Sequence, residues 1–332
     1  MNLVPPSYDI ITLGETMARF TPPGFERLGQ SPVVEIHVGG SESNTAVGLA
    51  RLGHKVAWIS RLTNNPIGRW IAGQIASHGV DVSFVQWTDD DRVGTYYMER
   101  GRPPRGSQVF YDRRHSAMSH MLPHEVPSEL FTAQRARIFH TTGITLGLGE
   151  AARRTAERCV QLARAGGLLV SFDLNYRSKL WSAADAYLIC EPFMAQADVI
   201  FMAIRDAHAV CGAAAEDSAE SVCRQLHPRW PGATLVITRG SLGAVALDPQ
   251  GTYFEQAAFP ADEVERLGGG DAFSAGYLCG LLEGQEIPSS LRWGCAAAAF
   301  KYTLPGDLPL LDRSPVERLA CATSPRSSSL ER

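Results

Sequence analysis

Three consecutive glycines precede a single carboxylate in the stretch Glu265–Gly276 (ERLGGGDAFSAG), and an apolar run of helical character, Ala272–Leu282, follows. Glycines at a loop-to-helix junction leave backbone N–H groups uncovered, and the start of a helix adds partial positive charge, so the junction suits an anion. Asp271 could simply cap this helix, but capping does not require three glycines in a row. The pattern therefore predicts a phosphate held by backbone amides, with Asp271 beside it as the base of a phosphoryl transfer.

Other motifs for phosphate, cofactor or nucleophilic chemistry are missing from the sequence. It contains no G-x-x-x-x-G-K-[ST], no H-E-x-x-H and no G-x-S-x-G, and no G-x-G-x-x-G follows the first expected strand. A dinucleotide-binding oxidoreductase therefore loses its main support. The seven cysteines are scattered and form no C-x-x-C pair, which favours buried, reduced thiols over disulfides or a zinc site.

The elements that must position Asp271 alternate along the chain between short apolar runs and helical stretches, several of which end at a glycine. Such alternation predicts a mostly parallel sheet with helices on both faces. The expected strands are Tyr8–Leu13, Lys55–Ile59, Arg137–Thr141, Leu168–Asp173, Asp198–Met202 and Thr234–Thr238, and the expected helices include Asn44–Leu52, Gly68–His78 and Glu150–Ala165.

Two segments, at about 16–38 and 93–116, break this rhythm with alternating, aromatic-rich patterns such as TYY at 95–97 and VFY at 109–111. They predict antiparallel strands that form one small sheet, a lid that closes over a ligand. An ordinary sheet edge is the alternative interpretation. Because the lid would have exposed edges and apolar residues, it also predicts a homodimer through the lid.

Composition limits the classes of function. With 332 residues, 45% of them hydrophobic, the chain can bury the core of one α/β domain. A net charge of −4 without a basic block argues against nucleic-acid or anionic-membrane partners. No apolar run reaches the roughly 20 residues of a membrane helix, and the first residues lack a secretion signal, so we expect a cytoplasmic protein. The Ser-rich tail, 322–332, is expected to be disordered.

The glycine-rich stretch is similar to the C-terminal signature of the ribokinase-like (phosphofructokinase B-type) carbohydrate kinases, usually D-T-x-G-A-G-D-x-F. Gly39–Gly53 (GGSESNTAVGLARLG) resembles the N-terminal signature of that family, and Thr238–Gly243 (TRGSLG) matches its nucleotide-side T-x-G-x-x-G. The signatures lie far apart in the chain, so together they are far more specific than either alone. The resemblance implies a three-layer α/β/α ribokinase-like domain over 8–320, with the lid contributed by the two irregular segments.

Within that family, the chain is most similar to the 2-keto-3-deoxygluconate kinases, in Val109–Ala117 (VFYDRRHSA), Ser171–Trp181 (SFDLNYRSKLW) and Lys301–Asp307 (KYTLPGD). These enzymes phosphorylate the terminal hydroxyl of a six-carbon keto-acid. The acid fits two arginines, Arg113 in the lid and Arg177 after a strand, because a guanidinium group offers a fork that matches a carboxylate. Each arginine could instead make a structural ion pair.

The resemblance also implies a role for each matching residue. The substrate would be bound by Gly39, Gly40, Asn44, Tyr96, Tyr111, Arg113, Arg177 and Asp307. Catalysis would use Asp271 as the base and the backbone N–H groups of Gly268, Gly269 and Gly270. The nucleotide would lie against Thr238, Gly240, Gly243, Gly268 and Gly270, and the metal against Asp206 and Glu265. The expected cofactors are ATP and Mg²⁺, with a monovalent cation as a further candidate.

Two departures from the family pattern leave alternatives open. Glu265 and Arg266 stand where the family has Asp-Thr, and Ala203–Asp206 (AIRD) stands where it has N-x-x-E. The alternatives are a kinase of the same family for a neutral sugar (fructose, ribose) or a nucleoside, and a sugar-binding regulatory protein that has lost catalysis. Retention of Asp271 and the three glycines favours an active enzyme.

Overall fold

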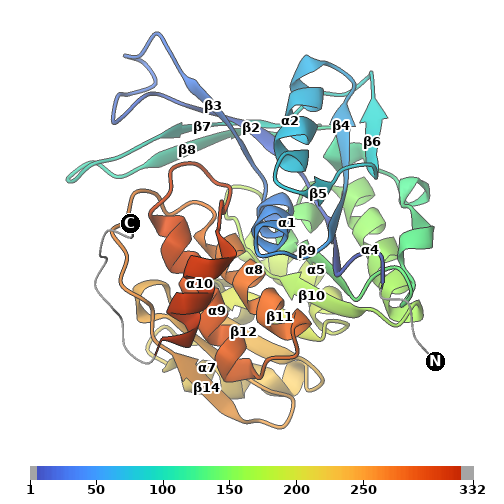
Figure 1. Cartoon of the computed structure of the whole chain (residues 1–332), viewed down its shortest axis with the longest axis vertical. Helices are drawn as coiled ribbons and strands as arrows, with labels where there is room; N and C mark the ends of the chain where they lie inside the picture. The colour runs from blue at the N-terminus through green and yellow to red at the C-terminus, as the bar shows by residue number, and fades with distance from the viewer. Residues whose placement is uncertain (1–5, 323–332) are drawn as a thin grey trace.

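A ten-stranded sheet forms the centre of the computed structural model, which describes residues 6–322 (Figure 1). Neighbouring strands run parallel except for the last two, which add an antiparallel edge. In spatial order the strands are β14 (Tyr253–Gln256), β13 (Ala244–Leu247), β12 (Thr234–Thr238), β11 (Val199–Ala203), β10 (Leu169–Asp173), β9 (Ile138–Thr142), β1 (Ile10–Leu13), β4 (Val56–Thr63) and β5 (Val80–Asp81), with β6 (Val85–Thr88) also paired to β4.

Helices cover both faces of this sheet, and each layer closes its own hydrophobic core. The strands can be apolar along their whole length because both faces are buried, as in β1, where all four side chains are buried. One layer contains α3 (Gly143–Leu146), α4 (Glu150–Ala165), α5 (Ala183–Met194), α6 (Ile204–Cys211) and α7 (Ala219–Leu226). The other contains α1 (Ser41–Arg51), α2 (Pro66–Ala76), α8 (Gly269–Leu282), α9 (Ile287–Tyr302) and α10 (Arg313–Cys321).

Helix α8 is buried on almost every side, which explains why it is apolar around its whole circumference. It packs closely against α9 because two of its residues have no side chain. A Cβ added to Gly276 would lie 2.4 Å from the carbonyl oxygen of Trp293, and one added to Gly280 would lie 2.8 Å from Oγ of Ser290. This close packing fixes the axis of the helix that carries Asp271.

The lid is a separate four-stranded sheet that projects from the body at the upper left of Figure 1. In spatial order its strands are β3 (Glu35–Gly39), β2 (Met17–Thr21), β7 (Thr95–Glu99) and β8 (Gln108–Asp112). The two outer pairings are antiparallel, but the central pairing of β2 with β7 is parallel. The expected antiparallel strands are therefore confirmed within each segment, and the parallel pairing between the two segments is an addition to that expectation. The two hairpins meet from distant parts of the chain, so no tight turn fixes the relative direction of their inner strands.

The predicted alternation and the small separate sheet are confirmed, with strand and helix ends displaced by one to four residues at several places. The helix after the glycines starts earlier than expected, at Gly269, so that Asp271 lies within its first turn. Among residues 6–322, no helix is both long and apolar enough to cross a membrane. The tail predicted to be disordered spans 322–332. Only Ala322 of this tail is among the described residues, and 323–332 lie outside them.

Candidate active site

Two of the three glycines at the start of α8 are required, each for a different reason. Gly268 has φ of +77°, in the left-handed region, and a Cβ there would lie 2.0 Å from the carbonyl oxygen of Asp307. A Cβ on Gly269 would lie 2.3 Å from the ring of Tyr302, whereas one on Gly270 would meet no atom within 4 Å. The chain thus turns sharply into the helix, and the first-turn amides point beyond the helix end, where an anion can bind.

The carboxylate of Asp271 is buried and is held by the first turn of α1. Ser41 donates a hydrogen bond from Oγ to Oδ1 of Asp271 at 2.7 Å, and Asn44 donates from Nδ2 to Oδ2 at 2.7 Å. Asn175, after β10, donates in turn from Nδ2 to Oγ of Ser41 at 2.7 Å. Two helix starts and the end of a sheet strand therefore fix the orientation of one carboxylate.

These contacts act in opposite directions on the acidity of Asp271. Burial raises its pKa above the usual value, because the charged form loses hydration. The hydrogen bonds from Ser41 and Asn44, and the positive charge of Arg177, stabilise the charged form and lower the pKa. The result is a carboxylate with raised proton affinity and fixed orientation, as a general base requires.

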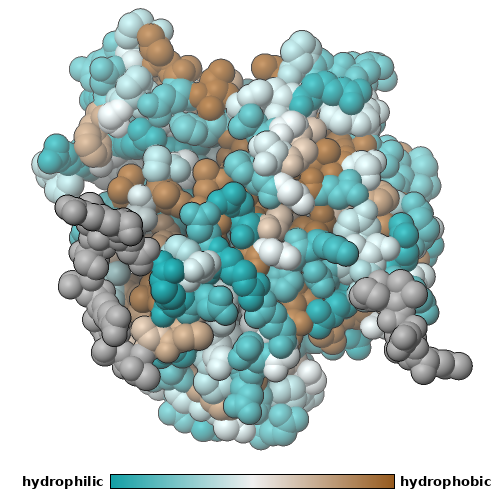
Figure 2. Space-filling model, viewed as in Figure 1, coloured by the Kyte–Doolittle hydropathy of each residue, from teal (hydrophilic) through white to brown (hydrophobic). Residues whose placement is uncertain are grey.

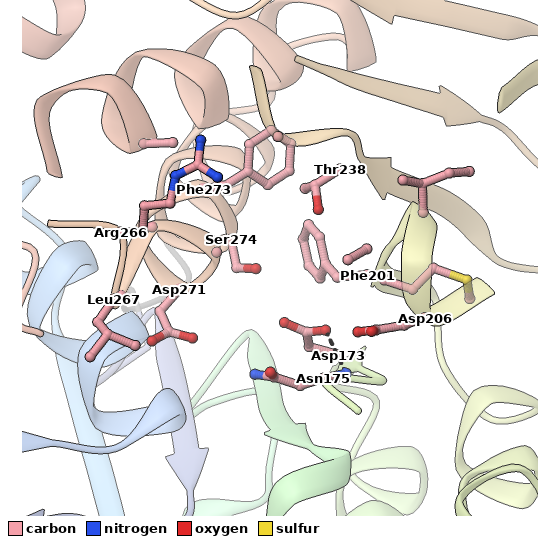
Figure 3. Close-up of a pocket in the computed structure, with 18 of the residues that line it drawn as sticks. Asp173, Asn175, Phe201, Asp206, Thr238, Arg266, Leu267, Asp271, Phe273 and Ser274 are labelled. Atoms are coloured by element: carbon pink, nitrogen blue, oxygen red, sulfur yellow. Dashed lines mark hydrogen bonds between the residues drawn. The ribbon is translucent and has the colours of Figure 1, made fainter. Parts of the chain in front are cut away.

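A cavity of about 510 Å³ opens in front of Asp271, between the carboxyl ends of the central strands and the start of α8. Figure 3 shows Asp271 on one side of this cavity, with Asp173 and Asp206 opposite it and Thr238 along the rim. The residues that line it are Tyr111, Asp173, Asn175, Arg177, Phe201, Met202, Ala203, Ile204, Arg205, Asp206, Thr238, Gly240, Gly243, Ala258, Phe259, Arg266, Leu267, Gly268, Gly269, Gly270, Asp271, Phe273, Ser274, Cys295, Ala298, Ala299 and Tyr302.

Asp173 and Asp206 form the acidic wall of the cavity. Burial, followed by the charges of Asp271 and Asp206, raises the pKa of Asp173 to about 8. Burial also raises the pKa of Asp206, although Arg205 lies 3.2 Å away and opposes this shift. Carboxylate oxygens that repel one another around a cavity are suited to a hard divalent cation.

One side of the cavity is formed by β12 and the turn that follows it. Thr238, Gly240 and Gly243 all line the cavity, and their predicted contact with a nucleotide remains a prediction. Gly243 has φ of +90°, and a Cβ there would lie 2.0 Å from the carbonyl oxygen of Gln256. Phe259 and Ala299 of α9 are apolar residues that also line the cavity, so a flat aromatic ring could be buried against them.

The two arginines predicted to hold a carboxylate have different surroundings. Arg177 lines the cavity and forms no ion pair within residues 6–322; its Nη1 donates only to the carbonyl oxygen of Tyr176, at 3.2 Å. Arg113 does not line the cavity and is paired with Glu15, with 2.9 Å between Nε and Oε2. In this structure Arg113 therefore makes the structural ion pair that the sequence left open, and only Arg177 presents its charge to the cavity.

Several other predicted residues lie in a buried network behind the cavity. Arg19 of β2 is fully buried and forms ion pairs with both Glu265 and Asp307, the latter at 2.5 Å. Tyr96 of β7 donates its hydroxyl to Oδ2 of Asp307, also at 2.5 Å. We name Arg19, Tyr96, Glu265 and Asp307 the lid anchor, because they join two lid strands to the body.

The lid anchor corrects part of the sequence interpretation. Glu265 was predicted as a metal ligand, but its carboxylate is buried against Arg19, Arg100 and the amide of Gly306, and it is not part of the cavity wall. A metal ligand needs free oxygen lone pairs, whereas these oxygens already face two guanidinium groups and an N–H. Asp206, the other predicted metal ligand, does line the cavity.

Some of the predicted substrate residues line the cavity, and others belong to the lid anchor. Tyr111 lines the cavity, but Tyr96 and Asp307 bind each other within the lid anchor. A Cβ on Gly39 would lie 2.3 Å from the Tyr96 hydroxyl, and one on Gly40 would lie 2.0 Å from the carbonyl oxygen of Glu15. The two glycines therefore allow the end of β3 to pack closely against Tyr96 of β7 and against the segment before β2. Their predicted contacts with a substrate remain predictions.

Sequence reasoning missed Ser41, Glu42, Asp173 and Asn175. Glu42 is fully buried next to Asp271, and its Oε1 accepts hydrogen bonds from Thr142 and Thr145, the latter at 2.6 Å. Burial raises the pKa of Glu42 to about 7. These four residues lie inside two motifs that the sequence analysis singled out, GGSESN and DLNYR. The sequence alone did not indicate that their polar side chains would lie close to Asp271.

A comparison with known protein families assigns the chain to a family. The model of the pfkB family carbohydrate kinases matches residues 8–312, which lie within the predicted kinase region 8–320. The chain belongs to the PfkB family of carbohydrate kinases. The predictions of a carbohydrate kinase and of a ribokinase-like three-layer fold are thereby confirmed.

Individual relatives have names from the same group of enzymes. The chain is 40% identical over 311 residues to a 2-dehydro-3-deoxygalactonokinase from Haloferax volcanii, covering 94% of this chain and 96% of that one. It is 28% identical to a 2-dehydro-3-deoxygluconokinase from Bacillus subtilis, covering 90% and 91%. The crystal structure of a 2-dehydro-3-deoxygluconokinase from Thermotoga maritima matches with a TM-score of 0.88 at 30% identity, covering 96% and 100%.

Proposed function

We propose that this PfkB kinase uses ATP and Mg²⁺ to phosphorylate the terminal hydroxyl of a keto-deoxy sugar acid. The observation that carries this proposal is the presence of Asp271 and Arg177 on one cavity. Asp271 provides a buried base beside a glycine-rich helix start, and Arg177 provides a positive charge that no acid within 6–322 neutralises at ion-pair distance. A neutral sugar would offer that guanidinium group only uncharged oxygens, whereas the carboxylate of a sugar acid would form a charge-assisted pair with it.

Asp271 would take the proton from the substrate hydroxyl as the hydroxyl oxygen attacks the terminal phosphorus. The bond between that phosphorus and the bridging oxygen breaks, and ADP leaves with the electron pair. The first-turn amides of α8, from Gly268 to Asp271, would bind the oxygens of the phosphoryl group during transfer. Ser41 and Asn44 keep the carboxylate of Asp271 directed at the hydroxyl.

Asp173 and Asp206 fit a magnesium ion and would hold it, directly or through water, because both carboxylates face the same cavity and have raised pKa values. When bound, Mg²⁺ offsets the negative charge of the phosphates. A monovalent cation remains a prediction. Lys301, which is fully buried, already places an ammonium group behind Gly268, where it donates to the carbonyl oxygen of Leu304 at 3.1 Å.

The substrate is proposed as 2-keto-3-deoxygluconate, on the strength of the three segments that the sequence shares with that group of kinases. Its epimer 2-keto-3-deoxygalactonate is the second candidate, because the relative with 40% identity has a galactonate name. The two acids differ at one hydroxyl. Both carry the carboxylate that Arg177 would bind, so the electrostatic argument supports them equally. A cytoplasmic location remains a prediction.

An ADP-release assay with both acids, fructose, ribose and adenosine tests the function. We expect turnover of a keto-deoxy acid and little of the neutral compounds. Replacing Arg177 with Gln should lower kcat/KM for the acid about 10- to 100-fold, the effect of one charge-assisted hydrogen bond. The exposed Arg154, changed to Gln, serves as the control. Turnover of only a neutral sugar would contradict the acid proposal, and no turnover of any substrate would favour a regulatory protein.

Asp271→Asn tests the base directly. The amide keeps the shape of the side chain but cannot accept the hydroxyl proton, so turnover should fall by about 10²- to 10⁴-fold. Binding of the sugar acid, measured by calorimetry, should stay close to that of the unchanged protein. Near-normal turnover of the variant would remove Asp271 from its assigned role.

Ser41→Ala should shift the acid side of the pH profile. The base works in its charged form, so activity rises as pH increases through the pKa of Asp271. Ser41 lowers that pKa by donating to the charged form; its removal should raise the pKa and move the acid limb of kcat/KM to higher pH. Ser43→Ala is a matched control, because Ser43 donates to the carbonyl of Gly40 instead. An acid limb that does not move would contradict the proposed network.

We also propose that two copies pair through the lid. One face of the lid is apolar and exposed, with Val33 at 61%, Ile36 at 48% and Phe110 at 48% exposure, and hydrophobic atoms gather over it at the top of Figure 2. Light scattering at micromolar concentration should give a molar mass twice that of one chain. The Ile36→Lys variant should have a molar mass closer to that of a single chain. A monomeric unchanged protein would contradict this proposal.

A further inference from the structure

Three side chains of metal-binding type converge at the end of α8 opposite Asp271. Cys279 and Glu283 lie one helical turn apart at the end of α8, and His54 lies in the turn between α1 and β4. Their ligand atoms are Nε2 of His54, Sγ of Cys279 and Oε1 of Glu283, and all three lie within 4.8 Å of one another. At about 1.5 Å per residue, Glu283 is roughly 18 Å from Asp271 along the helix.

The distances between these atoms match the edges of a tetrahedron around zinc. Nε2 of His54 lies 3.3 Å from Sγ of Cys279 and 3.7 Å from Oε1 of Glu283, and Sγ lies 3.7 Å from the same oxygen. Zinc–ligand bonds of about 2.0 to 2.3 Å at tetrahedral angles require ligand separations of about 3.4 to 3.6 Å. The three atoms would need to move only a few tenths of an ångström.

Two further residues orient these side chains. Asp9 lies with Oδ2 3.4 Å from Nδ1 of His54, which leaves Nε2 free to face the cluster. Arg313 lies with Nη2 2.7 Å from Oε1 of Glu283. A carboxylate oxygen has more than one lone pair, so Glu283 can accept from Arg313 and still bind a metal. Metal-binding histidines and carboxylates in proteins have partners of this kind.

The backbone holds the cluster in place without a metal. The amide of His54 donates to the carbonyl of Leu49 at 3.1 Å, and Gly53, with φ of +99°, lets the chain turn back there. The amide of Lys55 donates to Oδ2 of Asp9 at 3.0 Å. Cys279 is fully buried, but the side chain of Glu283 is 24% exposed, so an ion can enter from the solvent side.

We propose that His54, Cys279 and Glu283 bind a zinc ion, with a water molecule as the fourth ligand. One imidazole, one thiolate and one carboxylate suit zinc better than magnesium or calcium, which prefer oxygen ligands. The charges balance, because the thiolate and the carboxylate together neutralise Zn²⁺. The sulfur–hydrogen bond of Cys279 breaks when the sulfur–zinc bond forms, and the proton leaves to solvent.

Such an ion would stabilise the helix pairing that positions the catalytic residues. It would tie the α1–β4 turn to the end of α8, while the opposite ends of the same two helices hold Ser41 and Asp271. Its binding energy would add to the stability of the folded state, because the unfolded chain does not bring the three ligands together. The site would take no part in phosphoryl transfer.

Cobalt spectroscopy on full-length, untagged and chelator-treated protein tests the proposal. Co²⁺ added alone should give one equivalent of bound metal, with thiolate-to-cobalt absorption in the near ultraviolet and the visible bands of tetrahedral cobalt. Zn²⁺ should abolish these bands by displacement. Cys279→Ser should remove the thiolate band, and His54→Gln should weaken binding at least tenfold. Cys223→Ser, a buried cysteine on α7, is the matched control and should bind like the unchanged protein.

Stability provides a second readout. Zn²⁺ at 100 times its dissociation constant should raise the free energy of unfolding by about 2.7 kcal/mol, and this gain should be absent in Cys279→Ser and present in Cys223→Ser. The proposal is overturned if the unchanged protein shows no thiolate–cobalt band. It is equally overturned if Cys279→Ser retains that band, which would place the metal elsewhere.

Discussion

The burial of the Asp271 carboxylate is the constraint on which the rest of the site depends. A buried carboxylate is costly unless hydrogen bonds offset its lost hydration. Here two donors come from the first turn of α1 and a third residue supports them from β10. Two helices distant in sequence must therefore start at the same point, directly over the carboxyl ends of the central strands. The close packing of α8 on α9, which Gly276 and Gly280 allow, then fixes the direction of the catalytic helix.

The lid depends on the body through a second set of buried charges. Arg19 comes from one inner strand of the lid and Tyr96 from the other, and both bind Asp307. Glu265 joins the same guanidinium group from the segment that leads into the glycines. The position of the lid and the shape of the loop before α8 are therefore determined by one network, which explains why polar residues predicted as ligands are found between the lid and the body.

The sequence predicted the parts of this structure that depend on local patterns. The parallel sheet follows from the alternation of apolar runs, and Asp271 was singled out because three glycines precede it. Gly240 and Gly243 were singled out by the resemblance of their segment to a family motif, and both have φ angles in the left-handed region. Which charged side chains form ion pairs with each other could not be predicted in this way. The pairing of Arg113 with Glu15 and of Glu265 with Arg19 joins residues about 100 and 250 positions apart, and no local pattern encodes such contacts. The parallel pairing of β2 with β7 was missed for the same reason.

The lid anchor also constrains how this chain can diverge. Removing Arg19 would take away the cation that the buried carboxylates of Glu265 and Asp307 share, so a single substitution there is far more harmful than a coordinated set. Tyr111, by contrast, is 38% exposed and lines the cavity from the outer lid strand. A substitution on the outer strand therefore changes the cavity wall at one place, whereas a substitution in the lid anchor disturbs the inner lid strands and the segment before α8 together.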